Sequence, residues 1–261
     1  MSDEIQAYIG PGSYFQTTCY DTHLIITGDE WDPFHYFELF DRKILWINPS
    51  IQEVGGVEEL MMPRTVFICP SDNDYDGGLV MNRFASLICF VTRGVNISAS
   101  THVGTGWPAA AAAQPQQLKT GMKYGHDTID SLIASFLKPG VTEKRWIALA
   151  HFRQGKIAQT PYYRFLSNWK ILELHFNDKD PKITKHLTSY FTTNTAKVSS
   201  LQLGSKSPAD KMWDLRKMSA HFMLRGGAIQ DPDNPDLYNQ ADASANILED
   251  VVVDLISHGN W

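Results

Sequence analysis

The chain has no long apolar run. None of its 261 residues belong to a stretch that approaches the ~18 consecutive apolar residues of a membrane-spanning helix, so we expect no membrane association. The first residues, Met1–Glu4, are acidic and lack the basic-then-apolar order of a secretory signal. These two features favour a cytoplasmic protein.

The chain is also poor in cysteine. Its three cysteines, Cys19, Cys69 and Cys89, are odd in number and widely spaced, which argues against a disulfide framework and against a zinc pattern. We expect them to be buried thiols. The histidines and carboxylates form no HExxH motif, and no serine stands in a G-x-S-x-G elbow. The sequence therefore predicts no metal and no cofactor.

What the chain does have is an uneven distribution of charge. Its net charge is −6, but residues 1–141 hold 8 Lys and Arg against 16 Asp and Glu. Residues 144–217 hold 14 against 5, which gives +9, and residues 218–261 hold 1 against 7. A local excess of positive charge attracts a polyanion such as RNA. The alternative is that these lysines only solvate the faces of helices.

The periodicity of the apolar residues changes along the chain. The first hundred residues favour short strands, including a hairpin over 34–40 and 43–48 with a tight turn at Asp41–Arg42, and a helix over 79–93. The stretch WPAAAAAQPQQ from Trp107 is typical of a connector. From Gly125 onward, apolar residues recur at helical spacing in five or six segments with short links. We predict an α+β protein, with a small α/β domain over 1–107, a connector over 108–124 and an antiparallel helical bundle over 125–261.

One predicted helix carries an arginine and a histidine. Ser207 can cap it, Pro208 suits its first turn, and apolar residues follow at helical spacing through Phe222. Arg216 and His221 have four residues between them. The step of five residues from one to the other turns an ideal helix by about 140°, so the two side chains do not share a face.

A second predicted helix, over Tyr162–Phe176, is strongly amphipathic. Glu173 falls on its apolar side, four residues after Trp169. A carboxylate among core residues needs a partner, because an unpaired buried charge is unfavourable. We expect Glu173 to pair with Arg216 or His221. If Glu173 is the only partner of Arg216, Glu173→Leu should be better tolerated than Arg216→Leu.

Together these two helices resemble the HEPN superfamily, over roughly residues 125–261. Its mark is an arginine, four to six residues and a histidine, late in a helical bundle, and the run from Arg164 to Glu173 is similar to an early helix of MauJ-like and ApeA-like members. The resemblance implies metal-independent cleavage of single-stranded RNA by a homodimer whose helical domains face each other. It also implies the site residues Arg216 and His221.

Each site residue has an expected role. His221 would transfer protons, Arg216 would stabilise the charged phosphorane, and Glu173 would orient one of them. Lys217 and Arg164 would contact phosphates of the RNA backbone.

A non-catalytic module remains the alternative. Many active members have a small polar residue, often asparagine, directly after the arginine, where this chain has Lys217. In the alternative, Arg216 and His221 pair with Glu173 or Asp214 and only fasten helices together. The module would then bind a nucleic acid, a nucleotide or a protein.

Overall fold

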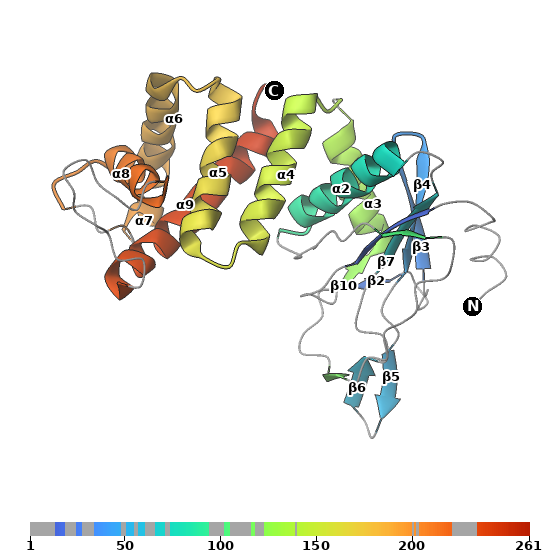
Figure 1. The fold of residues 1–261 in the computed structure, drawn as a ribbon. Helices are drawn as coiled ribbons and strands as arrows, with labels where there is room; N and C mark the ends of the chain where they lie inside the picture. The colour runs from blue at the N-terminus through green and yellow to red at the C-terminus, as the bar shows by residue number, and fades with distance from the viewer. Residues whose placement is uncertain are drawn as a thin grey trace. The chain divides into compact units, whose positions relative to one another are not determined.

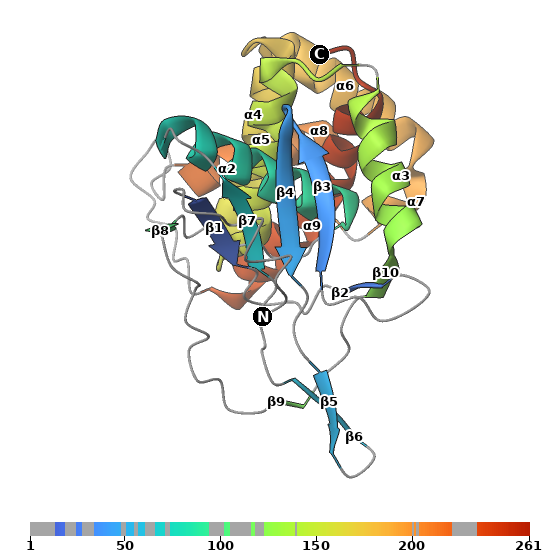
Figure 2. The same cartoon turned by 90° about the vertical axis from the view of Figure 1, so that its right-hand side faces the viewer.

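The computed structural model describes residues 14–18, 25–27, 34–47, 51–54, 57–60, 66–70, 74–93, 102–104, 116–117, 123–138, 140–199, 201, 204–220 and 234–261. The chain divides into two compact units, Met1–Gly140 and Val141–Trp261. Figure 1 labels most of their helices and strands, and Figure 2 also labels β1, β8 and β9.

The first unit is built around a five-stranded sheet in the order β3-β4-β7-β1-β8. Its neighbouring strands pair antiparallel, and several of them lie side by side in Figure 2. Their bounds are Phe34–Leu39 (β3), Arg42–Ile47 (β4), Val66–Pro70 (β7), Tyr14–Thr18 (β1) and His102–Gly104 (β8).

The remaining strands of this unit form two smaller sheets. One is antiparallel and holds Ile51–Val54 (β5), Val57–Leu60 (β6) and Gln116–Gln117 (β9). The other is a parallel pair of Ile25–Thr27 (β2) and Lys123–Gly125 (β10). Two helices, Asp74–Val91 (α2) and His126–Leu137 (α3), complete the unit.

Aromatic rings join α2 to the main sheet. The ring of Phe84 on α2 lies 5.3 Å from that of Phe37 and 6.5 Å from that of Trp46, centroid to centroid. The β3–β4 hairpin is the one predicted from the sequence, but its turn residues are Phe40 and Asp41, with φ of 52° and 56°. Positive φ at both central residues matches the right-handed twist of the strands in a two-residue hairpin. The turn therefore lies one residue earlier than expected.

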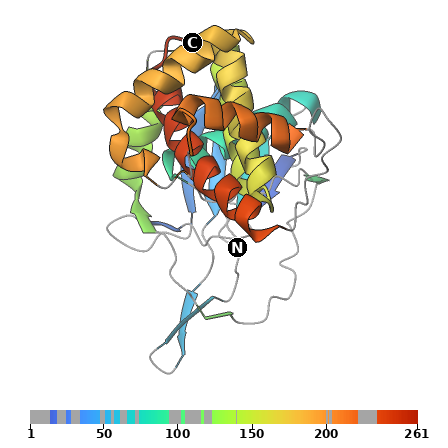
Figure 3. The same ribbon diagram turned by 90° about the vertical axis from the view of Figure 1, so that its left-hand side faces the viewer.

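The second unit is helical. Its helices are Glu143–Ile157 (α4), Pro161–Phe176 (α5), Asp180–Thr193 (α6), Thr195–Val198 (α7), Pro208–Ala220 (α8) and Pro235–His258 (α9). Helix α5 is central, because it packs against α4, α6, α8 and α9. Figure 3 shows this unit from the side of α6, α8 and α9, coloured orange to red. The short helix α7 was not expected from the sequence.

Local signals in the sequence explain where these helices begin and end. The Thr142, Thr160 and Asn234 side chains each accept a backbone N–H in the first turn of α4, α5 and α9. Pro161 and Pro235 suit first-turn positions, where a backbone N–H is not needed. Asn177 ends α5 in the left-handed conformation, with φ of 54°.

The structure agrees with the α+β class, because the described strands all belong to the first unit and the second unit is helical. The division between units falls after Gly140, whereas we expected the bundle to begin at residue 125. Helix α3 accounts for the difference, because it packs against α2, β2 and β10 of the first unit. Most of the expected connector, residues 108–124, lies outside the described residues. Within the described part of the chain, no helix is long and apolar enough to cross a membrane.

Candidate functional site

Helix α8 begins as the sequence predicts. The Ser207 hydroxyl accepts the backbone N–H of Asp210 at 3.2 Å and donates to the Asp210 carboxylate at 2.7 Å. Met212, Leu215 and Ser219 are buried on its inner face, and Arg216 is half-buried beside them. The described part of the helix ends at Ala220, so His221 lies outside the described residues.

Glu173 pairs with Arg216, as expected. Arg216 Nη2 donates to Glu173 Oε1 at 3.0 Å, and the two side chains are 33% and 24% exposed. The same oxygen accepts the indole N–H of Trp169 at 3.0 Å, which the sequence analysis did not foresee. Glu173 therefore joins α5 to α8 and holds the guanidinium of Arg216 in a fixed position.

Two tryptophans extend this contact to α6. The rings of Trp169 and Trp213 meet edge to face with centroids 4.7 Å apart. Trp213 Nε1 donates to Thr184 Oγ1 at 2.9 Å. We call Trp169, Glu173, Thr184, Trp213 and Arg216 the Arg216 cluster. It connects α5, α6 and α8 through directional contacts, each of which constrains the orientation of α8.

The other predicted site residues lie differently. Arg164 Nη2 donates to Asp242 Oδ1 of α9 at 2.8 Å and to the Asp242 carbonyl at 3.3 Å. Nine residues separate Arg164 from Glu173 on α5, which is about 13 Å along a helix. Arg164 is thus not brought into the Arg216 cluster and instead fastens α5 to α9. Lys217 is exposed, next to Arg216 on α8.

Acidic residues pair with several of the basic side chains in the stretch 144–217. Three of them belong to α9, and they form the pairs Lys156–Glu249, Arg164–Asp242 and Lys197–Asp250. Lys206 pairs with Asp214, the residue that we considered as an alternative partner of Arg216 or His221. The sequence carried a signal for this arrangement, because the stretch of +9 is followed by residues 218–261, which carry −6.

Two histidines missed by the sequence analysis lie at the end of α5 and on α6. The His175 ring contacts the rings of Phe176 and Trp261 at centroid distances of 4.7 and 4.6 Å. The His186 ring lies 5.2 Å from that of Phe176. Burial lowers the pKa of both histidines below the ordinary value, so both are neutral at neutral pH.

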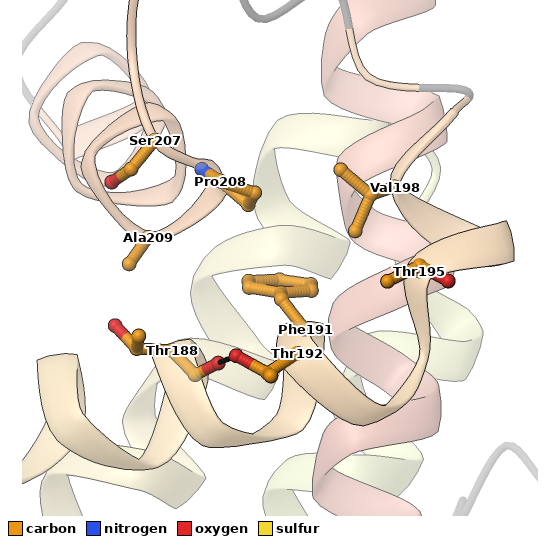
Figure 4. A pocket seen from close by; sticks show the side chains of 8 residues that line it. All are labelled: Thr188, Phe191, Thr192, Thr195, Val198, Ser207, Pro208 and Ala209. Atoms are coloured by element: carbon orange, nitrogen blue, oxygen red, sulfur yellow. Dashed lines mark hydrogen bonds between the residues drawn. The ribbon is translucent and has the colours of Figure 1, made fainter.

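A pocket of about 270 Å³ lies between α6, α7 and the start of α8. Figure 4 shows the Phe191 ring at its middle, with Ala209 and Thr188 on one side and Val198 and Thr195 on the other. Thr192, Ser207 and Pro208 complete the lining. The pocket is one helical turn from the Arg216 cluster on α6, since Thr188 follows Thr184 by four residues.

Among the residues that the structure describes, no three His, Cys, Asp or Glu side chains are grouped to hold a metal ion. Cys89 is buried, in line with the expectation for the thiols. The Arg216 cluster is therefore the main concentration of polar groups that the sequence analysis pointed to. Comparison with models of protein families, with curated proteins and with solved structures finds no match to this chain.

Proposed function

We propose that the helical unit is a HEPN-like domain that cleaves single-stranded RNA without a metal ion, using Arg216 and His221. The observation that supports this best is the contact of Arg216 with Glu173, which is itself hydrogen-bonded by Trp169. A guanidinium held in one position needs little reorganisation to stabilise charge that develops in a transition state.

The chemistry requires only proton transfer and charge stabilisation. RNA supplies its own nucleophile in the 2′-hydroxyl group. His221 removes the proton of that hydroxyl or protonates the leaving oxygen, because imidazole titrates near neutral pH. Arg216 uses one Nη2 bond to Glu173 and donates its remaining N–H groups to the non-bridging phosphate oxygens. Lys217, which is exposed, contacts a neighbouring phosphate.

The resemblance to the HEPN superfamily also implies a homodimer. We propose that two copies of the chain associate through their helical units and that single-stranded RNA is the partner. Arg164, Lys156 and Lys197 are paired with carboxylates of α9, so we expect RNA to contact exposed lysines outside those pairs, Lys217 among them.

Those same ion pairs favour a second candidate function. If the basic side chains mainly join helices, the Arg216–Glu173 pair is a structural clamp and the unit is a non-catalytic HEPN-like binding module. The clamp explains the hydrogen bond of Trp169 as well as the proposed catalytic role does. The two functions differ in what happens to RNA.

The test is to incubate the purified protein with labelled single-stranded RNA in excess EDTA. We expect cleavage by the unaltered chain and a loss of about 10²–10⁴-fold in His221→Ala, with RNA binding retained. Glu173→Gln keeps an acceptor for Trp169 but removes the charge that holds Arg216, so we expect an intermediate loss. Lys197→Gln alters an exposed ion pair away from the Arg216 cluster and serves as the control.

The results separate the two candidates. RNA binding without cleavage by the unaltered chain would support the non-catalytic module. Equal degradation by the unaltered chain and by His221→Ala would mean that a contaminating nuclease is responsible. Circular dichroism of each variant establishes that the helices are intact before activities are compared.

A further inference from the structure

The pocket between α6, α7 and α8 has a lining with a defined hydrogen-bonding character. Thr188 Oγ1 donates to the carbonyl of Thr184, and Thr192 Oγ1 donates to that of Thr188, both at 2.8 Å. The Ser207 hydroxyl donates to Asp210. Each hydroxyl carries a single hydrogen, so these three oxygens offer the pocket acceptors, and the Thr195 hydroxyl completes the polar part of the lining. A ligand with N–H donors therefore matches these three acceptors.

The rest of the lining is uncharged. Phe191, Val198, Pro208 and Ala209 provide apolar surface, and none of the eight lining residues is ionisable at neutral pH. These eight residues offer a charged group no oppositely charged partner. The lining thus favours a neutral ligand with an apolar body.

The size of the pocket limits the ligand further. A cavity of roughly 150 Å³ is known to hold benzene, and pockets for drug-sized molecules begin at about 300 Å³. A pocket of about 270 Å³ suits one or two fused rings. The Phe191 ring lies at the middle of the lining (Figure 4), where a planar ligand can stack on it or meet its edge.

We propose that this pocket binds an unpaired nucleobase. A nucleobase is neutral and planar, fits this volume, and donates hydrogen bonds through ring or exocyclic N–H groups. Aromatic stacking and base-edge hydrogen bonds are how proteins recognise single-stranded RNA. Ala209 precedes Arg216 by seven residues, about 10 Å along α8, which is within reach of a short stretch of RNA. Its use by RNA rests on the proposed function, whereas binding of a free nucleoside does not.

The first experiment measures binding without cleavage. Methyl and amide NMR shifts of His221→Ala are followed while adenosine, guanosine, cytidine or uridine is added, with benzene as a hydrocarbon control. A ligand of this size should bind with a Kd on the order of millimolar. The shifts should centre on Thr188, Ala209 and Val198.

Three variants assign the binding to the pocket. Val198→Phe fills the space and should weaken nucleoside binding by about 10-fold or more. Thr188→Val removes one acceptor and should weaken it about 5-fold. Thr193→Val, a threonine of α6 that does not line the pocket, should leave it unchanged. Because Val198 is half-buried, each variant is first compared with the unaltered chain by circular dichroism.

Several outcomes would overturn the proposal. No shifts with any nucleoside, benzene binding as tightly as the nucleosides, or unchanged binding in Val198→Phe would each do so. The source of the base is tested with short RNAs in which one position is abasic. If the abasic RNA binds more weakly than the intact RNA, and Val198→Phe removes that difference, the pocket holds a base that is part of RNA. Nucleoside binding with no effect on RNA shows a site for a free nucleoside, whether or not the chain cleaves RNA.

Discussion

The contact of Glu173 with Arg216 gives the sharpest prediction of stability. Losing one partner of a fully buried ion pair costs about 3–5 kcal/mol, while an exposed pair contributes about 0–1 kcal/mol. At 33% and 24% exposure this pair lies between those limits, so Arg216→Gln and Glu173→Gln should each lower the free energy of unfolding by about 1–2 kcal/mol. Glutamine at position 173 still accepts the Trp169 N–H.

Glu173→Leu should be more harmful. It removes the charge and also leaves the indole N–H of Trp169 without its acceptor. Trp169 as a residue is only 1% exposed. A buried donor left unpaired costs a further ~1–3 kcal/mol. The sequence predicted that Glu173→Leu is better tolerated than Arg216→Leu if Glu173 is the only partner of Arg216, and the bond from Trp169 adds a cost to Glu173→Leu that this prediction did not include.

The assay is urea unfolding of the full chain, followed by circular dichroism and tryptophan fluorescence. Arg216→Gln, Glu173→Gln and the double variant form a cycle, and their coupling energy should be about 1 kcal/mol. The pair Lys197–Asp250, with side chains 41% and 53% exposed, is the matched control. Its cycle should give no more than about 0.5 kcal/mol.

Two results would refute this reasoning. Strict additivity of Arg216→Gln and Glu173→Gln would show that the two side chains do not interact in solution. A Glu173→Leu variant as stable as Glu173→Gln would show that the Trp169 N–H does not depend on Glu173. Either result would also remove the main support for a fixed Arg216.

Two further predictions concern the end of α9. Acidification should destabilise the helical unit, because the pKa values of His175 and His186 are lowered in the folded chain. Above a pH of about 6.5 both histidines are neutral in the folded and the unfolded chain, whereas below it the unfolded chain takes up protons first. Unfolding midpoints measured from pH 7.5 to 5 should therefore fall, and an unchanged midpoint would contradict this. Gly259→Ala should lower stability by about 1–3 kcal/mol, since its Cβ would lie 2.5 Å from the Leu255 carbonyl oxygen, and thermal unfolding would show this against Gly204→Asn, where nothing lies within 4 Å.

Local signals made the helices of the second unit largely predictable. A capping residue or a first-turn proline marks the start of α4, α5, α6, α8 and α9, and α5 and α8 begin within a residue or two of where the sequence places them. The membership of α3 was not predictable in the same way. Its apolar spacing is that of any amphipathic helix, and only contacts with α2, β2 and β10, distant in sequence, assign it to the first unit.

The site was predictable where one helical face was enough. Glu173 lies on the apolar side of α5, and burial of a carboxylate demands a donor, which is Arg216 in the structure. Which donors share its oxygen was not readable, because Trp169 Nε1 reaches Glu173 only through its side-chain orientation. The partner of Arg164 could not be predicted, because Asp242 is 78 residues away and no local pattern indicates the pair.

The charge pattern of the chain acquires a different meaning once α9 is placed. A stretch of +9 followed by one of −6 first indicated a surface for a polyanion. In the fold, Asp242, Glu249 and Asp250 of α9 lie against basic residues of α4, α5 and α7, so the two stretches compensate each other within the same unit. Any attraction for RNA must then come from the cations outside these pairs, such as the exposed Lys217, which follows the Glu173-paired Arg216 on α8. A surface formed by part of the basic stretch should bind RNA with an affinity that depends on salt less than the full +9 implies.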